Sequence, residues 1–599
     1  MNHRNLTPQE IAQLQSQGNR AEDWSRVVVA DPICLDSIYN NQFYGSVLLG
    51  PIAQECIQRG DLVLPQGISD SRLRDCHIGA HCAIHGVKML VGYTIGHDTL
   101  LFNIDEMTAS DHYHWLEPMN ENGGRRILPF SGMTIGDAYL WARFRGQSKL
   151  MERLEQFTNT ELQTPQGTYA QVGDHCTIKN TKSLHNVAVR SQADDPTAII
   201  DCIHLADGVV GLGCTLDYGV IAERFLLGEH VHLEFGLRLN DTVVGDNSTL
   251  ARCEVGNSII FPAHEQHHNN SFLIAALIMG QSNIAAGGTL GSNHNSRTAD
   301  NELSCGRGFW PGLCVSLKHS SRFASNCLLA KGDYPNELNI TLPFALVNNN
   351  VAADRLEVMP AYWWMYNMYA MDRNSRKFAQ RDKRHAKAQH IEFDNLAPDT
   401  AEEIIIARDL LHLWTEEAYR EQRPFITAHG MEKSRRPTVI LKAGEGYKAY
   451  YDMLVYYAMK ALGADPAQAT LPQPPQADAP RETRWVNLGG QLIAEADLQQ
   501  LIADIEEGNL DSWQAIHQRL DQLWQHYPQQ KQQHAYQVLC HLAQKRSLDA
   551  DDQRQFLADY RRILQYVDDQ KVLSRKKDDQ NQFRNMTYWN DAERNAVLQ

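Results

Sequence analysis

The chain has 599 residues, a formal net charge of −16 and 43% hydrophobic residues. The negative charge, without a basic stripe interleaved with aromatic residues, argues against nucleic-acid binding. The N-terminus lacks an apolar signal region, and the longest apolar run, Phe272 to Met279, is too short to cross a bilayer. We therefore expect a soluble, cytoplasmic protein that is not bound to a membrane.

The first segment, residues 1–44, is predicted to be a helical lead-in. Thr7-Pro8-Gln9-Glu10 forms a capping box with a proline in the first turn, which predicts a helix over about residues 8 to 17.

A five-residue motif then recurs. It consists of an aliphatic residue, a glycine and three further residues, of which the last is usually small or β-branched. In most copies another aliphatic residue follows six positions after the first. The copies are Ile78-Gly79-Ala80-His81-Cys82, Ile95-Gly96-His97-Asp98-Thr99, Val172-Gly173-Asp174-His175-Cys176, Val210-Gly211-Leu212-Gly213-Cys214, Leu227-Gly228-Glu229-His230-Val231 and Val244-Gly245-Asp246-Asn247-Ser248. Repetition at a fixed period predicts a solenoid.

The spacing indicates a triangular coil of short parallel strands. The aliphatic residues point inward, and the glycine is expected at the turn, where it permits dihedrals that a Cβ would resist. Cys82, Cys176 and Cys214 occupy the small-residue position and are interpreted as reduced core residues. Histidines after the turn glycine, such as His81 and His230, are expected to face solvent or to stack in ladders.

These repeats resemble the hexapeptide repeat of left-handed parallel β-helix proteins, a superfamily dominated by acyltransferases that also includes γ-class carbonic anhydrases. The resemblance implies a mainly β fold, a left-handed parallel β-solenoid with a helical insertion and an α-helical C-terminal region. It also implies a homo-oligomer, with a trimer favoured and a dimer possible, because an apolar strip on the coil gains by burial against its copies.

Changes in composition and periodicity divide the rest of the chain into segments. Ala138 to Phe157 and Trp363 to Lys387 are expected to be helical, and Thr400-Ala401-Glu402-Glu403 is a second capping box. The predicted segments are first rungs over 45–104, an insertion with a helix over 105–168, the main β-helix with a polar site over 169–350, a helical region over 351–462, a Pro/Gln-rich linker over 463–483 and a helical domain over 484–599.

Residues 261 to 333 concentrate histidine, asparagine and basic side chains, which a β-helix core has little use for. Three runs in and after this region, Gly291 to Arg297, Gly306 to Gly312 and Leu329 to Pro335, resemble an uncharacterised bacterial family of unknown function. We therefore place the candidate site here.

A neutral histidine suits the role of general base. His294 is flanked by asparagines, and His319 is next to a lysine, so these two are the predicted catalytic residues. The predicted substrate-binding residues are Asn293, Asn295, Arg297, Arg307, Lys318, Arg322 and Lys331. A rival interpretation makes His264, His267 and His268 ligands of a divalent metal. A further basic cluster from Arg373 to Lys387 is expected to form a solvated or interface-forming helix rather than a phosphate site.

No Walker motif, Rossmann fingerprint or GxSxG sequence is present, and no glycine-rich phosphate loop precedes the first rungs. The leading hypothesis is acyl transfer, with acyl-CoA or another acyl thioester as co-substrate, to an amine or hydroxyl of a small anionic metabolite that is phosphorylated or derived from a sugar. The alternatives are a non-catalytic ligand-binding or scaffold protein and a metal-dependent hydratase or lyase.

Overall fold

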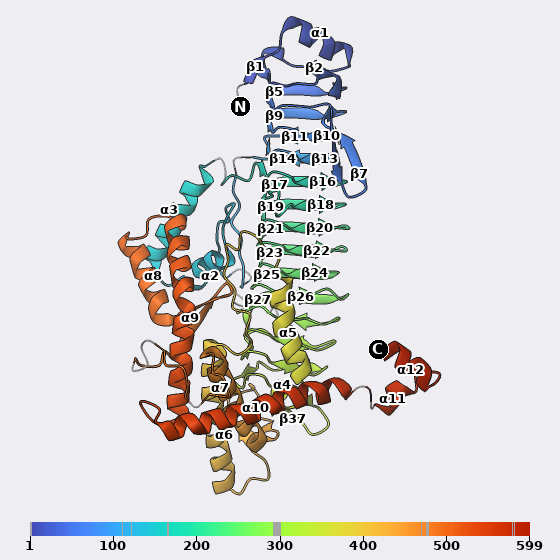
Figure 1. The fold of residues 1–599 in the computed structure, drawn as a ribbon. Coiled ribbons are helices and arrows are strands. Elements are labelled where there is room, and N and C mark those ends of the chain that lie inside the picture. The colour runs from blue at the N-terminus through green and yellow to red at the C-terminus, as the bar shows by residue number, and fades with distance from the viewer. Residues whose placement is uncertain are drawn as a thin grey trace.

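Figure 1 shows the computed structural model, in which parallel strands stack into one long solenoid with several helices, α2, α3, α8 and α9, along one side. The structure describes residues 3–110, 112–120, 123–164, 167–291, 301–468, 470–474, 479–577, 579 and 581–598. The predicted β-solenoid with a helical insertion and a helical C-terminal region is confirmed.

One long sheet forms two faces of the coil, because its longer strands bend around a corner at a residue with positive φ, such as Arg224 (φ 47°). Its strands are β1 His3–Asn5, β2 Arg20–Ala21, β3 Val27–Ala30, β5 Gln42–Leu49, β9 Arg72–Ile78, β11 Leu90–Val91, β12 Thr94–Ile95, β14 Glu106–Thr108, β15 Gln171–Val172, β17 Ser183–Val189, β19 His204–Val210, β21 Ile221–Leu227, β23 Arg238–Val244, β25 Cys253–Ile260, β27 Ser271–Ile278, β28 Thr289–Leu290, β29 Leu303–Cys305, β31 Ser316–Leu317, β32 Arg322–Phe323, β34 Asp333–Tyr334 and β35 Asn339–Ile340.

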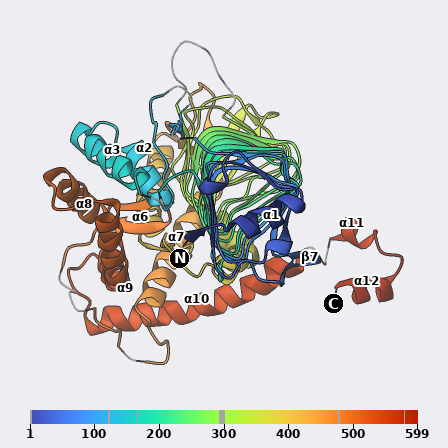
Figure 2. The same ribbon diagram turned by 90° about the horizontal axis from the view of Figure 1, so that it is seen from above.

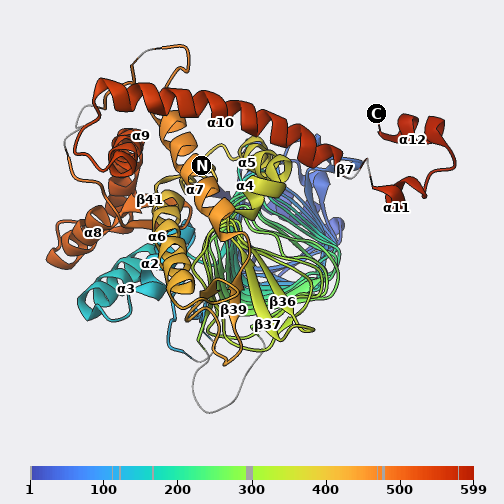
Figure 3. The same cartoon turned by 90° about the horizontal axis from the view of Figure 1, so that it is seen from below.

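A second sheet forms the third face. Its strands are β4 Ile38–Tyr39, β8 Gly67–Ser69, β10 Ala83–Val87, β13 Leu100–Ile104, β16 Thr177–Lys179, β18 Ala198–Ile200, β20 Thr215–Asp217, β22 His232–Glu234, β24 Thr249–Ala251 and β26 Glu265–Gln266. At the C-terminal end of the coil, further strands pair with one another, as Figure 3 shows from below for β36, β37 and β39. These are β30 Trp310–Pro311, β33 Leu328–Leu329, β36 Leu346–Asn350, β37 Arg355–Met359, β38 Thr427–Ala428 and β39 Thr438–Ile440. Two hairpins form separate two-stranded sheets. They are β6 Cys56–Arg59 with β7 Leu62–Pro65, and β40 Trp485–Leu488 with β41 Gln491–Ala494.

The coil core follows the aliphatic positions of the repeat. Leu205 pairs with Ala222, and Ala222 pairs with Leu239, an offset of 17 residues per turn. This offset is one residue short of three hexapeptides, so one side of each turn is shorter than the other two. The inward residues Leu216, Ala222 and Leu227 are fully or almost fully buried, as expected for a core in which each rung covers its neighbours.

The repeat glycines have a different role from the predicted one. Gly211 does not have a positive φ, but a Cβ there would lie 2.1 Å from the carbonyl oxygen of Gly228 in the next rung. The positive φ falls two residues after the glycine, at Gly213 (67°) and His230 (53°). The glycine is therefore required because adjacent corners stack too closely for a side chain, and not because of its own dihedrals.

The helices are α1 Pro8–Ser16, α2 Ile135–Arg143, α3 Ser148–Leu162, α4 Tyr362–Tyr366, α5 Met368–Arg381, α6 Pro398–Arg420, α7 Ala443–Ala461, α8 Glu495–Glu507, α9 Trp513–Ala543, α10 Ala550–Lys576, α11 Gln582–Asn585 and α12 Asp591–Leu598. Viewed from above, α2, α3, α8 and α9 lie on one side of the coil (Figure 2). They bury an outward-facing apolar strip of the long sheet. The strip consists of Ala188, Val209, Leu226, Val243, Ile259 and Leu277.

Three sequence expectations need adjustment. Coil strands begin with β2, ahead of residue 45, since β5 pairs with both β2 and β9. The helix expected in the insertion is divided into α2 and α3. The helix expected from Thr400 begins at Pro398, and Thr400 Oγ1 instead accepts a hydrogen bond from the backbone N–H of Ala397 (2.9 Å). Across the described ranges, no helix is both long and apolar enough to span a membrane.

Candidate functional site

His264, predicted as a metal ligand, is buried at a corner of the coil. Its ring nitrogens hydrogen-bond with Ser282 Oγ (2.8 Å) and Gln266 Oε1 (3.1 Å). Burial lowers the pKa of His264 to about 4, so the ring is neutral at pH 7. These contacts indicate a satisfied core histidine.

His267 and His268 lie beside α5. His267 Nδ1 is 3.1 Å from Glu265 Oε2, and its ring lies 4.6 Å from that of His268 between centroids. Glu265 also pairs with Lys377 (2.9 Å) and Arg381 (2.7 Å), which come from the basic cluster noted in the sequence. In the part of the chain that the structure describes, no group of three or more His, Cys, Asp or Glu could hold a metal ion, so the metal prediction gains no support.

Lys318 and His319 follow β31 at a corner next to Gly291. The Gly291 N–H donates to Leu317 O (3.1 Å), and a Cβ on Gly291 would lie 3.3 Å from His319 Cε1. His319 is 7% exposed, and Lys318 Nζ lies 3.3 Å from Glu337 Oε1. His319 therefore lies next to Gly291, which is two residues before Asn293 in the sequence.

The predicted run with Asn293, His294, Asn295 and Arg297 lies outside the described residues, so the pairing of His294 with His319 stays a prediction. The side chains of Arg322 and Lys331 are exposed, on β32 and after β33 respectively.

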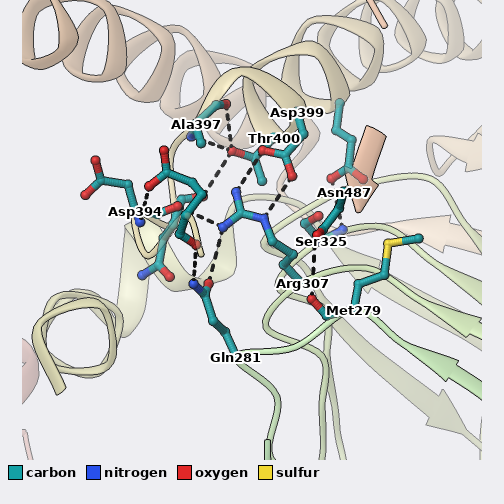
Figure 4. Close-up of polar contacts among 12 residues, drawn as sticks. Met279, Gln281, Arg307, Ser325, Asp394, Ala397, Asp399, Thr400 and Asn487 are labelled. Atoms are coloured by element: carbon teal, nitrogen blue, oxygen red, sulfur yellow. Dashed lines mark hydrogen bonds and ion pairs between the residues drawn. The ribbon is translucent and has the colours of Figure 1, made fainter. Parts of the chain in front are cut away.

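Arg307 lies buried between the coil and the helices (Figure 4). Its Nε and Nη2 donate to the two carboxylate oxygens of Asp399 (2.8 Å each), and Nη1 donates to Asp394 O (2.9 Å) and Gln281 Oε1 (3.3 Å). All three nitrogens are engaged by protein oxygens. Arg307 therefore links the coil to α6 and to the segment before α6 by an ion pair and hydrogen bonds.

That segment, residues 382–397, links α5 to α6 and is called the strap below. Between the strap, the start of α2 and the coil corners lies a cavity, the corner cavity, which encloses about 20 Å³, or about 340 Å³ when the space open to solvent is included. It is lined by Gly132, Met133, Thr134, Arg190, Val209, Gly211, Leu227, Gly228, Glu229, Asp246, Ala388 and Gln389. Three regions far apart in the sequence thus meet around one small space.

Buried charges fix the strap to the coil. Arg384 forms an ion pair with Asp246, and its Nε lies 2.8 Å from Asp382 Oδ1. Both Arg384 and Asp246 are nearly fully buried, and Arg384 Nη1 also donates to Gln389 O (2.7 Å). The Gln389 side chain in turn accepts from the backbone N–H of Gly136, in the first turn of α2 (2.8 Å). Through Gln389, the strap is therefore hydrogen-bonded to both the insertion and Arg384 beside the cavity.

Beside the cavity, one carboxylate is hydrogen-bonded to two histidines. Asp195 Oδ1 lies 2.7 Å from His230 Nε2 and 2.8 Å from His385 Nδ1. Burial raises the pKa of Asp195, but the hydrogen bonds from His385 and His230 outweigh that effect and leave the pKa below its usual value. The hydrogen bond and charge of Asp195 raise the pKa of His385. His230 therefore faces a carboxylate and not bulk solvent, in contrast to the sequence expectation.

Glu229 is one of two carboxyl groups that line the cavity, and the other, Asp246, is paired with Arg384. Glu229 is 4% exposed; its Oε2 accepts from the backbone N–H of Lys387 (3.1 Å), and Oε1 has no hydrogen-bond partner among the described residues. Burial, and then the charge of Asp246, raise the pKa of Glu229, while the charges of Arg384 and Arg190 oppose the shift. A buried carboxyl with a raised pKa beside an arginine has the properties of a general acid or base near an anion site.

The sequence contains a partial signal for this site. Glu229 and Asp246 follow the turn glycine in two successive repeats. Residues 190–197 lengthen one corner and carry Asp195. Acidic residues at stacked corners and an irregular rung are therefore visible in the sequence. The sequence does not show that the strap covers these acidic residues in the folded chain.

Comparison with known proteins identifies the family. A family model described as "Domain of unknown function (DUF4954)" matches residues 3–271 and 162–414. The chain belongs to this family. A second model, "Domain of unknown function (DUF6819)", matches residues 473–595. An uncharacterised protein of Treponema pallidum (strain Nichols) is 41% identical to this member of the DUF4954 family, over 99% of the present chain and 90% of the relative. No solved structure matches.

Proposed function

We propose that this protein is an acyltransferase of the hexapeptide-transferase type, that its reaction takes place in the corner cavity, and that Glu229 is the general base. The observation that carries the proposal is the buried carboxyl of Glu229, which lines the cavity with an oxygen that accepts no hydrogen bond from the described chain. Leaving a buried acceptor unsatisfied costs about 1–3 kcal/mol. A substrate hydroxyl or amine in the cavity would supply the missing donor.

The proposed step balances without a further reactant. Ionised Glu229 takes the proton of the acceptor hydroxyl or amine, the acceptor oxygen or nitrogen bonds to the acyl carbon, and the C–S bond of the thioester breaks. The thiolate leaves and takes the proton that Glu229 holds, which returns Glu229 to its ionised form. Because its pKa is raised, Glu229 is a stronger base when ionised than an exposed glutamate.

The cavity also suggests the class of acceptor. Arg190 lines it and can bind a phosphate or carboxylate. The enclosed space of the cavity, about 20 Å³, holds a group about the size of one water molecule. We therefore expect a small anionic acceptor, phosphorylated or derived from a sugar, of which only the reacting hydroxyl or amine enters the cavity, and the thioester of acyl-CoA would meet it at the opening.

The fold is consistent with this chemistry but does not determine it, since one fold supports many activities. Thermal-shift measurements with acyl-CoAs and phosphorylated sugars or amino sugars test the binding part of the proposal. We expect at least one anionic acceptor to raise the Tm of the wild type, and Arg190→Ala to remove the shift. The matched control, Arg20→Ala, alters an exposed arginine on β2 in the first coil and should retain it.

A shift that persists in Arg190→Ala would place the anion elsewhere. A shift without any turnover would identify a ligand-binding protein in place of an enzyme.

A further inference from the structure

A second cavity lies in the helical layer, away from the residues of the corner cavity. It encloses about 70 Å³, or about 510 Å³ when the space open to solvent at its mouth is included, and is bounded by α4, α5, α7, α10 and the strap. Its inner wall is apolar and largely buried. This wall includes Trp364, Met368, Met371, Leu396, Tyr457 and Val567. Aromatic rings and flexible methionine side chains make a surface that suits a large apolar group of varied shape.

The mouth of this cavity carries charges of both signs. Lys571 Nζ lies 3.1 Å from Asp372 Oδ1, and Lys460 Nζ lies 3.0 Å from Asp394 Oδ1; all four residues line the cavity. These pairs are partly exposed, with Lys460 55% and Lys571 31% exposed in their side chains. Exposed ion pairs contribute little to stability, so a ligand can replace one partner at low cost.

We propose that this cavity binds a small zwitterion with a large apolar side group, that is, an α-amino acid with an aromatic or long aliphatic side chain. The apolar group would occupy the inner wall. The ligand carboxylate would bind Lys460 or Lys571, and its ammonium would bind Asp372 or Asp394. A zwitterion can bind a lysine and an aspartate of the mouth at the same time, whereas a simple acid or amine can bind only one of them. Asp394 also pairs with Lys531 (2.9 Å) and Asp372 with Arg376 (2.5 Å), so each carboxylate keeps a cation when the ligand displaces a lysine. This inference does not depend on the proposed acyl transfer.

Isothermal titration calorimetry of the full chain tests the proposal with L-tryptophan, L-phenylalanine and L-leucine. Tryptamine lacks the carboxylate and indole-3-propionate lacks the ammonium, so they isolate each charge. We expect at least one amino acid to bind and, for tryptophan, each analogue to bind at least tenfold more weakly.

The matched variants are Lys571→Ala and Lys576→Ala, which alter two lysines of α10, one at the cavity and one exposed beyond it. Lys571→Ala should weaken amino-acid binding at least tenfold, whereas Lys576→Ala and Glu229→Gln should leave it unchanged. Absence of binding by all three amino acids at millimolar concentration would overturn the proposal, as would equal binding of tryptophan and its two analogues. If Lys571→Ala lowers the Tm markedly, Asp372→Asn provides the second test, with weakened binding of tryptophan and unchanged binding of indole-3-propionate.

Discussion

At the scale of single residues, Glu229 should give the protein a distinctive pH dependence. Its pKa is raised in the folded chain above the ordinary value of 4.5, mainly by burial. The folded state therefore holds this proton more tightly than the unfolded state does, so the contribution of Glu229 to stability is present below about pH 4.5 and is lost as the pH rises through the raised pKa.

Glu229→Gln removes this effect while keeping the shape of the side chain. We expect the Tm of the variant, relative to that of the wild type, to increase between pH 5 and pH 8. Calorimetric scans of both proteins over that range measure the difference. A difference that does not vary with pH would mean that Glu229 titrates like an exposed glutamate.

The buried pair of Arg384 and Asp246 leads to a second residue-scale prediction. Both side chains are only 2–3% exposed, so Arg384→Ala should leave an uncompensated buried carboxylate and destabilise the chain by about 3–5 kcal/mol. Unfolding by urea measures the loss. The exposed Arg373→Ala is the control.

Combining Arg384→Met with Asp246→Leu should recover part of that stability, because the desolvation of both charges is removed together, while Asp382 still loses its ion pair with Arg384. A single Arg384→Ala variant with wild-type stability would mean that the strap is not held by this pair.

At the scale of elements, the sequence was sufficient to predict those helices and strands that are determined by residues close together in the chain. The capping box of α1 is present as predicted, with Glu10 N–H donating to Thr7 Oγ1 and Thr7 N–H donating to Glu10 Oε2. The solenoid could be predicted because each rung repeats the same short-range pattern. The corner cavity could not, since Thr134, Glu229 and Gln389 are brought together only by the packing of the insertion and the strap on the coil.

The stacking role of the repeat glycines can be tested by adding one methyl group. In Gly211→Ala the Cβ would lie 2.1 Å from the Gly228 oxygen, so we expect a loss of about 1–3 kcal/mol from overpacking. Gly146, between α2 and α3, has no neighbouring atom within 4 Å of the position of an added Cβ and no positive φ. Gly146→Ala should therefore be neutral or slightly stabilising. Equal Tm values for the two variants would contradict the stacking explanation.

At the scale of the whole molecule, the helices cover the surface on which the oligomer expectation relied. The apolar strip from Ala188 to Leu277 packs against α2, α3, α8 and α9 of the same chain. A trimer or dimer would therefore need another face of the coil, and the homo-oligomer stays a prediction. Light scattering at micromolar concentration tests it against the mass of one chain, 67.9 kDa. A mass near that value would contradict the oligomer, and a mass two or three times larger would show that a different face mediates assembly.

The most direct test of the proposed function is the release of free thiol from acetyl-CoA in the presence of small phosphorylated amino sugars. We predict acceptor-dependent release by the wild type and a rate lower by about 10² to 10⁴ in Glu229→Gln, the usual contribution of a general base. Glu106→Gln, at an exposed position on β14, should retain the wild-type rate. Equal rates for the wild type and Glu229→Gln would contradict the assignment of Glu229 as the base and of the corner cavity as the active site.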